Sequence, residues 1–303
     1  MPAEIEIEGV RFTNPDRVLY PGQGITKRGL AEYYRAVAPW MLPLIEDRPL
    51  TLLRCPRGRE QQCFIQRRAE DSIPDNVLRV EVTLRDENTE TVTHLAIDSL
   101  AGILALVQMG VLELHIWMAR RDRLDRPDRM VMDLDPDESL PFDAVVEGAL
   151  RVRELLEKVG LIPFVMTTGG KGLHVVVPLR RTASWDAVRE AARGIAEGLE
   201  REAPERYLAQ ASRAARKGRV FVDYLRNGYG ATSVAPYSTR ARPGAPVATP
   251  LTWAELQRGI APREFDVTTV PARMRTLQQD PWADFRASAR SLSRRAVAAL
   301  AGR

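Results

Sequence analysis

Alternating apolar and polar residues dominate the first 120 residues of the chain. Apolar positions recur with a period of two over 50–54, 63–66, 78–84, 91–97 and 111–117, a pattern typical of β-strands. Helices interrupt it twice: Thr26 can cap one whose apolar stripe runs from Leu30 to Met41, and a second is expected over 98–109. The first part of the chain is therefore predicted to be rich in β-structure.

From residue 129 the pattern changes to strand, helix, strand. A strand over 130–135 precedes a helix whose apolar stripe, from Phe142 to Val159, has a period of 3.6. Further along, a hairpin is expected over 164–177, a helix over 184–199, a strand over 219–225 and a loop over 239–250. We predict an α+β fold with a central antiparallel or mixed sheet flanked by helices and a smaller β-rich N-terminal part. It forms one domain over 1–303, with parts at about 1–120, about 121–260 and, as short helices, about 261–303.

Composition narrows the class of protein. The 44 Lys and Arg outnumber the 40 Asp and Glu only slightly, which permits a polyanionic partner without requiring one. No apolar stretch is long enough for a membrane span and the acidic start is unlike a signal peptide, so a cytoplasmic protein without membrane contact is expected. Cys55 and Cys63 form no CxxC pair, and we expect reduced packing residues and neither a disulfide nor a zinc site.

Two carboxylates share one face of the strand over 130–135. Alternation places Asp133 and Asp135 on the side opposite Met132, about 7 Å apart, where a cation between them relieves their repulsion. Hard oxygen ligands favour Mg²⁺ or Mn²⁺. Asp223 ends another apolar strand and completes a two-metal site if the two strands are neighbours. The alternative, a solvated strand end, stays open at this point.

A glycine-rich segment, Thr167-Thr168-Gly169-Gly170-Lys171-Gly172-Leu173-His174, lies between two strand-like runs. Its backbone N–H groups and the lysine can face phosphate oxygens. Gly172 stands where a Walker A loop needs Ser or Thr, so that motif is excluded. A plain hairpin turn is the alternative reading.

The order of these motifs resembles the archaeo-eukaryotic primase superfamily, and most closely the polymerase domain of bacterial DNA ligase D. The similarity extends from Asn14-Pro15-Asp16-Arg17 to Trp253-Ala254-Glu255-Leu256 and includes Asp133-Leu134-Asp135-Pro136 and Tyr237-Ser238-Thr239-Arg240.

The resemblance implies a role for each matching residue. Asp133, Asp135 and Asp223 match the catalytic metal-binding carboxylates, and the nucleotide-binding positions are Thr168, Gly170, Lys171, His174, His115 and Arg240. Arg240 would contact the triphosphate and His115 the sugar. Without the resemblance, an isolated histidine such as His115 would more often be a packed or surface residue. Arg17 and Lys27 match a pair that holds a DNA 5′-phosphate, and Phe64 an aromatic residue that stacks on template bases. Three residues differ from those usual in the family: Leu53 replaces a basic residue, Ile65 a second aromatic residue and Ile116 the proline that follows the histidine. These differences concern template binding, not catalysis.

The function implied by the resemblance is DNA-end repair by nucleotidyl transfer. A DNA 3′-hydroxyl at a gap or double-strand break attacks the α-phosphate of a nucleoside triphosphate, preferably a ribonucleotide, with two Mn²⁺ or Mg²⁺ ions as cofactors. Implied partners are gapped DNA with a 5′-phosphate, a Ku-like end binder and a DNA ligase, in the bacterial cytoplasm at the nucleoid. The rival functions are a stand-alone primase that starts chains de novo and a non-catalytic module that bridges DNA ends; a nuclease would need a Glu-x-Lys partner after Asp133, which the sequence lacks.

Overall fold

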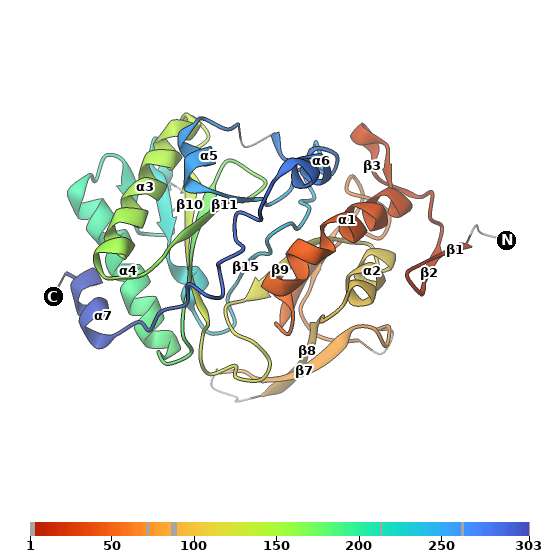
Figure 1. The fold of residues 1–303 in the computed structure, drawn as a ribbon, viewed down its shortest axis with the longest axis horizontal. Helices are drawn as coiled ribbons and strands as arrows, with labels where there is room; N and C mark the ends of the chain where they lie inside the picture. Colours follow the sequence, from red (N-terminus) through yellow and green to blue (C-terminus); the bar gives the residue numbers. More distant parts are fainter. Residues whose placement is uncertain (1–3, 71–72, 86–89, 213, 262–263, 303) are drawn as a thin grey trace. The chain divides into compact units, whose positions relative to one another are not determined.

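The computed structural model describes residues 4–302 except 71–72, 86–89, 213 and 262–263. The chain forms two compact units, whose elements are labelled in Figure 1. Unit 1 comprises residues 1–122, 234–249 and 263–280, and unit 2 comprises residues 123–233, 250–262 and 281–303. Each unit is thus assembled from segments that are distant in the sequence. In the described part of the chain, no helix has both the length and the apolar character needed to cross a membrane.

Unit 1 is built around an antiparallel sheet with the order β9-β5-β8-β7, to which β6 adds by pairing with β5. Its strands are β5 (Leu50–Arg54), β6 (Phe64–Gln66), β7 (Leu78–Thr83), β8 (Thr91–Ala96) and β9 (Val111–Trp117). The other elements are β1 (Glu4–Ile7), β2 (Val10–Thr13), β3 (Val18–Tyr20), the 3-10 helix η1 (Pro21–Gln23), β4 (Ile25–Thr26), α1 (Lys27–Ile45), α2 (Leu100–Gln108) and α6 (Thr269–Thr276). The predicted strands and both helices are confirmed.

Helices α1 and α2 lie side by side and supply much of the core of unit 1 (Figure 1). Leu30, Met41 and Leu104 are fully buried, as an apolar stripe on each helix requires. The hydroxyl of Thr26 accepts a hydrogen bond from the Gly29 N–H at 3.1 Å, which confirms the predicted cap of α1.

Unit 2 has a mixed sheet with the order β13-β14-β10-β12-β11-β16, antiparallel except for the pair β13 and β14. Its elements are β10 (Arg129–Pro136), α3 (Phe142–Lys158), β11 (Phe164–Thr167), β12 (Leu173–Pro178), α4 (Trp185–Glu202), β13 (Tyr207–Leu208), η2 (Ala214–Arg216), β14 (Val220–Asp223), η3 (Leu225–Asn227), β16 (Pro250–Leu251), α5 (Trp253–Gln257) and α7 (Arg294–Leu300). The strand β15 (Thr232–Val234) lies where the chain returns to unit 1. The mixed sheet agrees with the predicted fold class.

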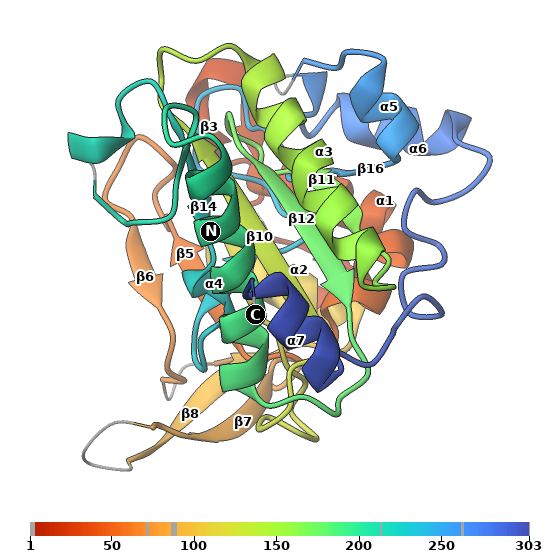
Figure 2. The ribbon, with the colours of Figure 1, turned by 90° about the vertical axis from the view of Figure 1, so that its left-hand side faces the viewer.

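Helices α3 and α4 cover one face of this sheet, with α7 against α4 (Figure 2). A methyl group of Leu134 lies so close to α3 that a Cβ added at Gly148 would be 3.2 Å from it. Leu134 therefore belongs to the face of β10 that the helices cover, and the alternate residues Asp133 and Asp135 project from the other face. The short strands β13, β15 and β16 were not expected, because two or three residues carry no readable period.

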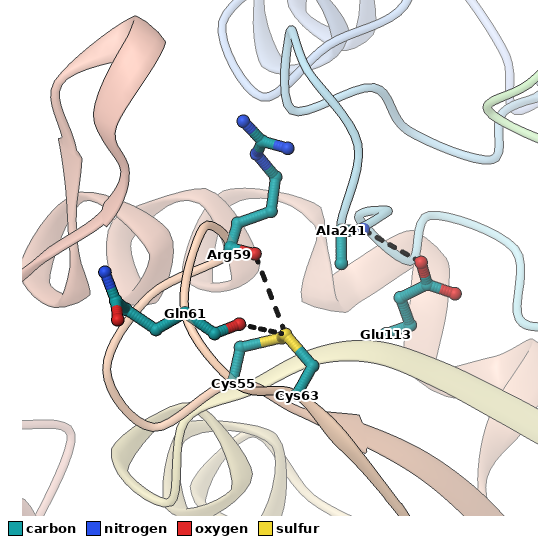
Figure 3. The surroundings of a disulfide bond; sticks show 6 residues. All are labelled: Cys55, Arg59, Gln61, Cys63, Glu113 and Ala241. Carbon is teal, nitrogen blue, oxygen red and sulfur yellow. Dashed lines mark hydrogen bonds between the residues drawn. A yellow bond between two sulfur atoms is a disulfide. The ribbon is translucent and has the colours of Figure 1, made fainter.

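Cys55 and Cys63 form a disulfide bond, so the expectation of reduced packing residues is wrong (Figure 3). Pairing of β5 with β6 places Arg54 opposite Phe64. Cys55 follows Arg54 and Cys63 precedes Phe64, just beyond the paired ends of the two strands, and the two Cα atoms are 4.3 Å apart. The hairpin register, which a spacing of 8 residues does not reveal, brings the thiols together.

Candidate active site

Asp133 lies on β10, a central strand of unit 2, between two antiparallel neighbours. The register places it opposite His174 of β12 and opposite Asp223 of β14. Directly opposed residues of antiparallel strands project to the same face of a sheet, and Asp135, two residues further, shares that face. The three carboxylates that the sequence predicted as a group therefore share one region of the sheet.

Arg226 links two of these carboxylates. Its Nε lies 3.2 Å from Oδ2 of Asp133 and 3.2 Å from Oδ2 of Asp223. The 3-10 turn η3 positions the arginine, because the buried Asn227 donates a hydrogen bond to the Val131 carbonyl at 2.7 Å and accepts one from the Val131 N–H at 2.8 Å. The guanidinium thus partly neutralises two opposed negative charges.

The neighbours of each carboxylate separate their pKa values. Burial alone would raise the pKa of Asp133, but the charges of His174 and Arg226 outweigh it and lower that pKa to about 2. Burial, followed by the negative charge of Asp133, raises the pKa of Asp135 to about 6. Burial also raises the pKa of Asp223, against the charge of Arg226. Asp135 is therefore the carboxylate whose charge is least compensated.

The glycine-rich turn ends beside the carboxylates. Both the N–H and the hydroxyl of Thr168 donate to the carbonyl of Gly172, at 3.2 and 3.1 Å, and this closes a tight turn. A Cβ at Gly172 would lie 2.7 Å from the Leu134 carbonyl oxygen of β10, so only glycine fits there. Lys171 is exposed and its Nζ donates to the Glu138 carbonyl at 2.7 Å. The turn thus places the exposed ammonium group of Lys171 at the end of the sheet that carries the acids.

The donor set suits a hard divalent cation. Oδ1 of Asp133 is buried without a well-formed hydrogen bond, 3.3 Å from Nε2 of His174, and a Cβ added at Gly172 would lie 3.3 Å from Oδ1 of Asp135, so the glycine leaves room beside that oxygen. No three acid, His or Cys side chains among the described residues already converge as metal ligands. Because Nε of Arg226 contacts both Asp133 and Asp223, metal ions bound by these two carboxylates would have to displace that guanidinium.

A second polar cluster lies in unit 1 and contains the other two predicted nucleotide-binding residues. Oε2 of the buried Glu113 lies 2.8 Å from Nε2 of His115 and accepts a hydrogen bond from Nε of Arg240 at 3.0 Å. Oε1 accepts the Ala241 N–H at 2.8 Å. His115 and Arg240 are thus neighbours in space although 125 residues separate them in the sequence.

Arg17 and Lys27 differ in their accessibility. Arg17 is exposed, donates to the Pro56 carbonyl at 3.0 Å and lines a pocket of about 340 Å³ with Asn14 and Asp16. Lys27 is only 4% exposed, and its Nζ donates to the Thr13 carbonyl at 2.9 Å and to Gln108. Burial, with the nearby charge of Arg17, lowers the pKa of Lys27 to about 8. Arg17 presents its charge outward, and Lys27 links the end of β2 to the end of α2.

Phe64 is not a core residue. Its ring is 41% exposed at the edge strand β6, and the guanidinium carbon of Arg54 lies 5.2 Å from the ring centroid. Ile65, which stands where a second aromatic residue is common in the resembling family, is 63% exposed. An exposed ring with a cation against one face can stack on a flat apolar partner.

Arg226 and Glu113 were not predicted from the sequence. Both had a weak signal: Arg226 follows Asp223 by three residues, and Glu113 precedes His115 by two and so shares its strand face. Neither spacing shows that the side chain meets a second functional residue, which depends on tertiary contacts.

The chain is similar to known proteins over most of its length. The family model described as "LigD, primase-polymerase domain" matches residues 26–282. The multifunctional non-homologous end joining protein LigD of Pseudomonas aeruginosa is 37% identical over 286 residues, which are 94% of this chain and 34% of that protein. The bifunctional non-homologous end joining protein LigD of Bacillus subtilis is 29% identical over 278 residues, 91% of this chain and 44% of that protein.

A solved structure shows the same fold. The polymerase domain from Mycobacterium tuberculosis ligase D in complex with DNA superposes with a TM-score of 0.84 at 34% identity, over 92% of this chain and 99% of that one. The chain spans between 32% and 44% of the length of the curated relatives in P. aeruginosa, mycobacteria and B. subtilis.

Proposed function

The chain belongs to the LigD primase-polymerase family, and we propose on this basis that it adds nucleotides to DNA 3′ ends at gaps and double-strand breaks. The observation that supports this most is the register of β10: Asp133 lies opposite Asp223, with Asp135 on the same face and the glycine-rich turn beside them. A DNA-bridging module has no use for three acids gathered next to a polyanion, so the enzymatic reading is preferred.

The chemistry follows from the residues of unit 2. Asp133, Asp135 and Asp223 would hold two Mn²⁺ or Mg²⁺ ions, which lower the pKa of the attacking 3′-hydroxyl and stabilise the leaving pyrophosphate. Lys171 exchanges the Glu138 carbonyl for phosphate oxygens, while Thr168 and Gly170 shape the turn whose N–H groups face the phosphates. His174, opposite Asp133, fixes the orientation of that carboxylate.

Unit 1 supplies contacts to the substrates. His115 binds the 2′-hydroxyl of the sugar, which would give a preference for ribonucleotides, and Arg240 binds the triphosphate, which both sugars share. Arg17 binds a downstream 5′-phosphate, Lys27 joins it by exchanging one of its internal hydrogen bonds, and Phe64 stacks on a template base. The biological partners are a Ku-like end binder and a DNA ligase, at the nucleoid in the bacterial cytoplasm. De novo priming is the second candidate.

The test is primer extension on gapped DNA with Mn²⁺ or Mg²⁺ and with ribo- or deoxyribonucleotides. Asp133→Ala, Asp135→Ala and Asp223→Ala should each lower extension by about 10³-fold or more and leave DNA affinity unchanged. Asp143→Ala, which alters an exposed acid on α3, is the matched control and should extend normally. Extension within tenfold of wild type would remove that aspartate from the site.

A second arm separates end repair from priming. Gapped DNA with a downstream 5′-phosphate should bind about tenfold tighter than the same DNA with a 5′-hydroxyl, because an exposed arginine recognises the extra charge of a terminal phosphate. Arg17→Ala should abolish this difference and leave extension of a simple primer-template unchanged. Equal binding of both DNAs by the wild-type protein, together with products formed without a primer, would favour the primase.

A further inference from the structure

Glu113 joins three donors from two distant segments of unit 1. It is 6% exposed on β9, and its two oxygens contact His115 Nε2 at 2.8 Å, Arg240 Nε at 3.0 Å and the Ala241 N–H at 2.8 Å. Figure 3 shows the last of these contacts. One carboxylate therefore sets the positions of both residues to which the proposed function gives nucleotide contacts in this unit.

The segment that carries Arg240 is itself fixed to β9. The hydroxyl of Ser238 accepts the Leu114 N–H at 2.9 Å, and the hydroxyl of Thr239 donates to the Leu112 carbonyl at 2.5 Å. Both hydroxyl groups are fully buried. The backbone of this segment and the Nε atom of Arg240 are thus both anchored to β9.

Glu113 remains ionised over the whole working range. Burial would raise its pKa, but hydrogen bonding from His115 and the charge of Arg240 lower that pKa to about 2. An ionised carboxylate only accepts hydrogen bonds, so the Nε2 atom of His115 must carry a proton. In the neutral ring, Nδ1 is then the acceptor nitrogen.

We propose that Glu113 is a positioning residue for the incoming nucleotide: it fixes the proton of His115 on Nε2 and aims the guanidinium of Arg240. In the nucleotide complex we assign the hydrogen bond to Nδ1 to the 2′-hydroxyl of the sugar, which a 2′-deoxyribonucleotide lacks. The inference rests on the proposed function of His115 and Arg240 and adds the group that makes them selective. Holding binding groups in place before the ligand arrives raises affinity without a new ligand contact.

The first experiment compares Glu113→Gln with wild type in steady-state extension with ribo- and deoxyribonucleoside triphosphates. The variant keeps the size of the side chain but turns one acceptor into a donor that faces His115 and Arg240. We expect the ribo-to-deoxyribo ratio of kcat/KM to fall by about tenfold and the nucleotide KM to rise, with DNA affinity unchanged. Glu81→Gln is the control. Glu81 is an exposed acid of the same sheet that accepts a hydrogen bond from the Thr93 hydroxyl at 2.7 Å. This variant should retain the wild-type ratio.

A double-substitution cycle then separates positioning from a general loss of structure. If Glu113 acts through His115, the variant that combines Glu113→Gln with His115→Ala should have the same sugar ratio as His115→Ala alone. A merely structural role would lower kcat/KM equally for both sugars and leave the ratio at its wild-type value. The proposal is overturned if Glu113→Gln keeps the wild-type sugar ratio while His115→Ala changes it.

Nitrogen-15 NMR of the His115 ring tests the same idea without turnover. The wild-type protein should show the proton on Nε2. If Glu113→Gln fails to fold, Glu113→Asp, which retains the charge but has a shorter side chain, takes its place. A wild-type ring protonated on Nδ1 alone overturns the proposal. If His115→Ala leaves the sugar ratio unchanged while the ring keeps its Nε2 proton, the assignment of His115 to the sugar fails and the positioning contact stands.

Discussion

Asp133 and Asp135 are two residues apart on β10, yet replacing them with asparagine should change stability in opposite directions. The pKa of Asp135 is raised from 3.8 to about 6, so folding favours its protonated form. The ionised form therefore destabilises the fold, by nothing below pH 4 and by up to about 3 kcal/mol at pH 7. Asp135→Asn removes that charge and should raise the free energy of unfolding at pH 7 by about 1–3 kcal/mol.

Asp133 behaves in the reverse way. Its pKa is lowered from 3.8 to about 2, so its ionised form stabilises the fold above pH 4, and this stabilisation is lost only as the pH falls through 2. Asp133→Asn gives up the charge interactions with His174 and Arg226 and should lower the free energy of unfolding at pH 7 by about 2 kcal/mol. Both variants should fail in primer extension. Asp135→Asn should therefore abolish activity while it raises stability.

The assay is urea denaturation followed by tryptophan fluorescence, with a chelator present, at pH 7 and pH 4. The Asp135→Asn effect should shrink to about 0.5 kcal/mol at pH 4, and the Asp133→Asn effect should persist. Asp143→Asn, at an exposed position in the first turn of α3, serves as the control and should lower the free energy of unfolding by less than about 1 kcal/mol at either pH. Loss of stability in Asp135→Asn at pH 7, or the same sign for both variants, would refute the electrostatic account of the site.

Three further predictions concern the turn and the disulfide. Lys171→Ala should raise the nucleotide KM about tenfold without changing DNA affinity, as measured by steady-state kinetics and DNA titration; an unchanged KM would contradict the phosphate role. Gly172→Ala places a Cβ 2.7 Å from the Leu134 carbonyl and should lower the free energy of unfolding by about 1–3 kcal/mol, whereas Gly198→Ala, on α4 with ample space, should not. Reducing the bond between Cys55 and Cys63 should lower the free energy of unfolding by about 2–3 kcal/mol, as expected for a loop closed over 8 residues, and an unchanged urea midpoint with dithiothreitol would contradict it.

The sequence by itself determined the longer helices and strands and the acidic face of β10. Periods of 2 and 3.6 are local properties, so the strands and helices around Thr26, Asp133 and Trp185 could be predicted with nearly the observed bounds. Alternation also fixed which face of β10 carries Asp133 and Asp135. The family resemblance identified the residues to examine, and the turn at Gly172 was visible from its glycines.

Only the tertiary structure decided which distant residues meet. Strand order and register place Asp223 and His174 on either side of Asp133, and no local pattern specifies a partner strand. The same dependence on non-local contacts explains why Arg226 and Glu113 escaped notice.

Burial and pairing in unit 1 are equally non-local. Lys27 points inward because the carbonyls of Thr13 and Gln108 accept hydrogen bonds from its ammonium group. Its position beside the Pro-Gly turn had suggested an exposed cation on a loop. The bond between Cys55 and Cys63 exists because β5 and β6 pair in one register out of several that the sequence would allow. Charge, period and glycine content are readable along a chain, whereas the partner of each polar group is a property of the packed fold.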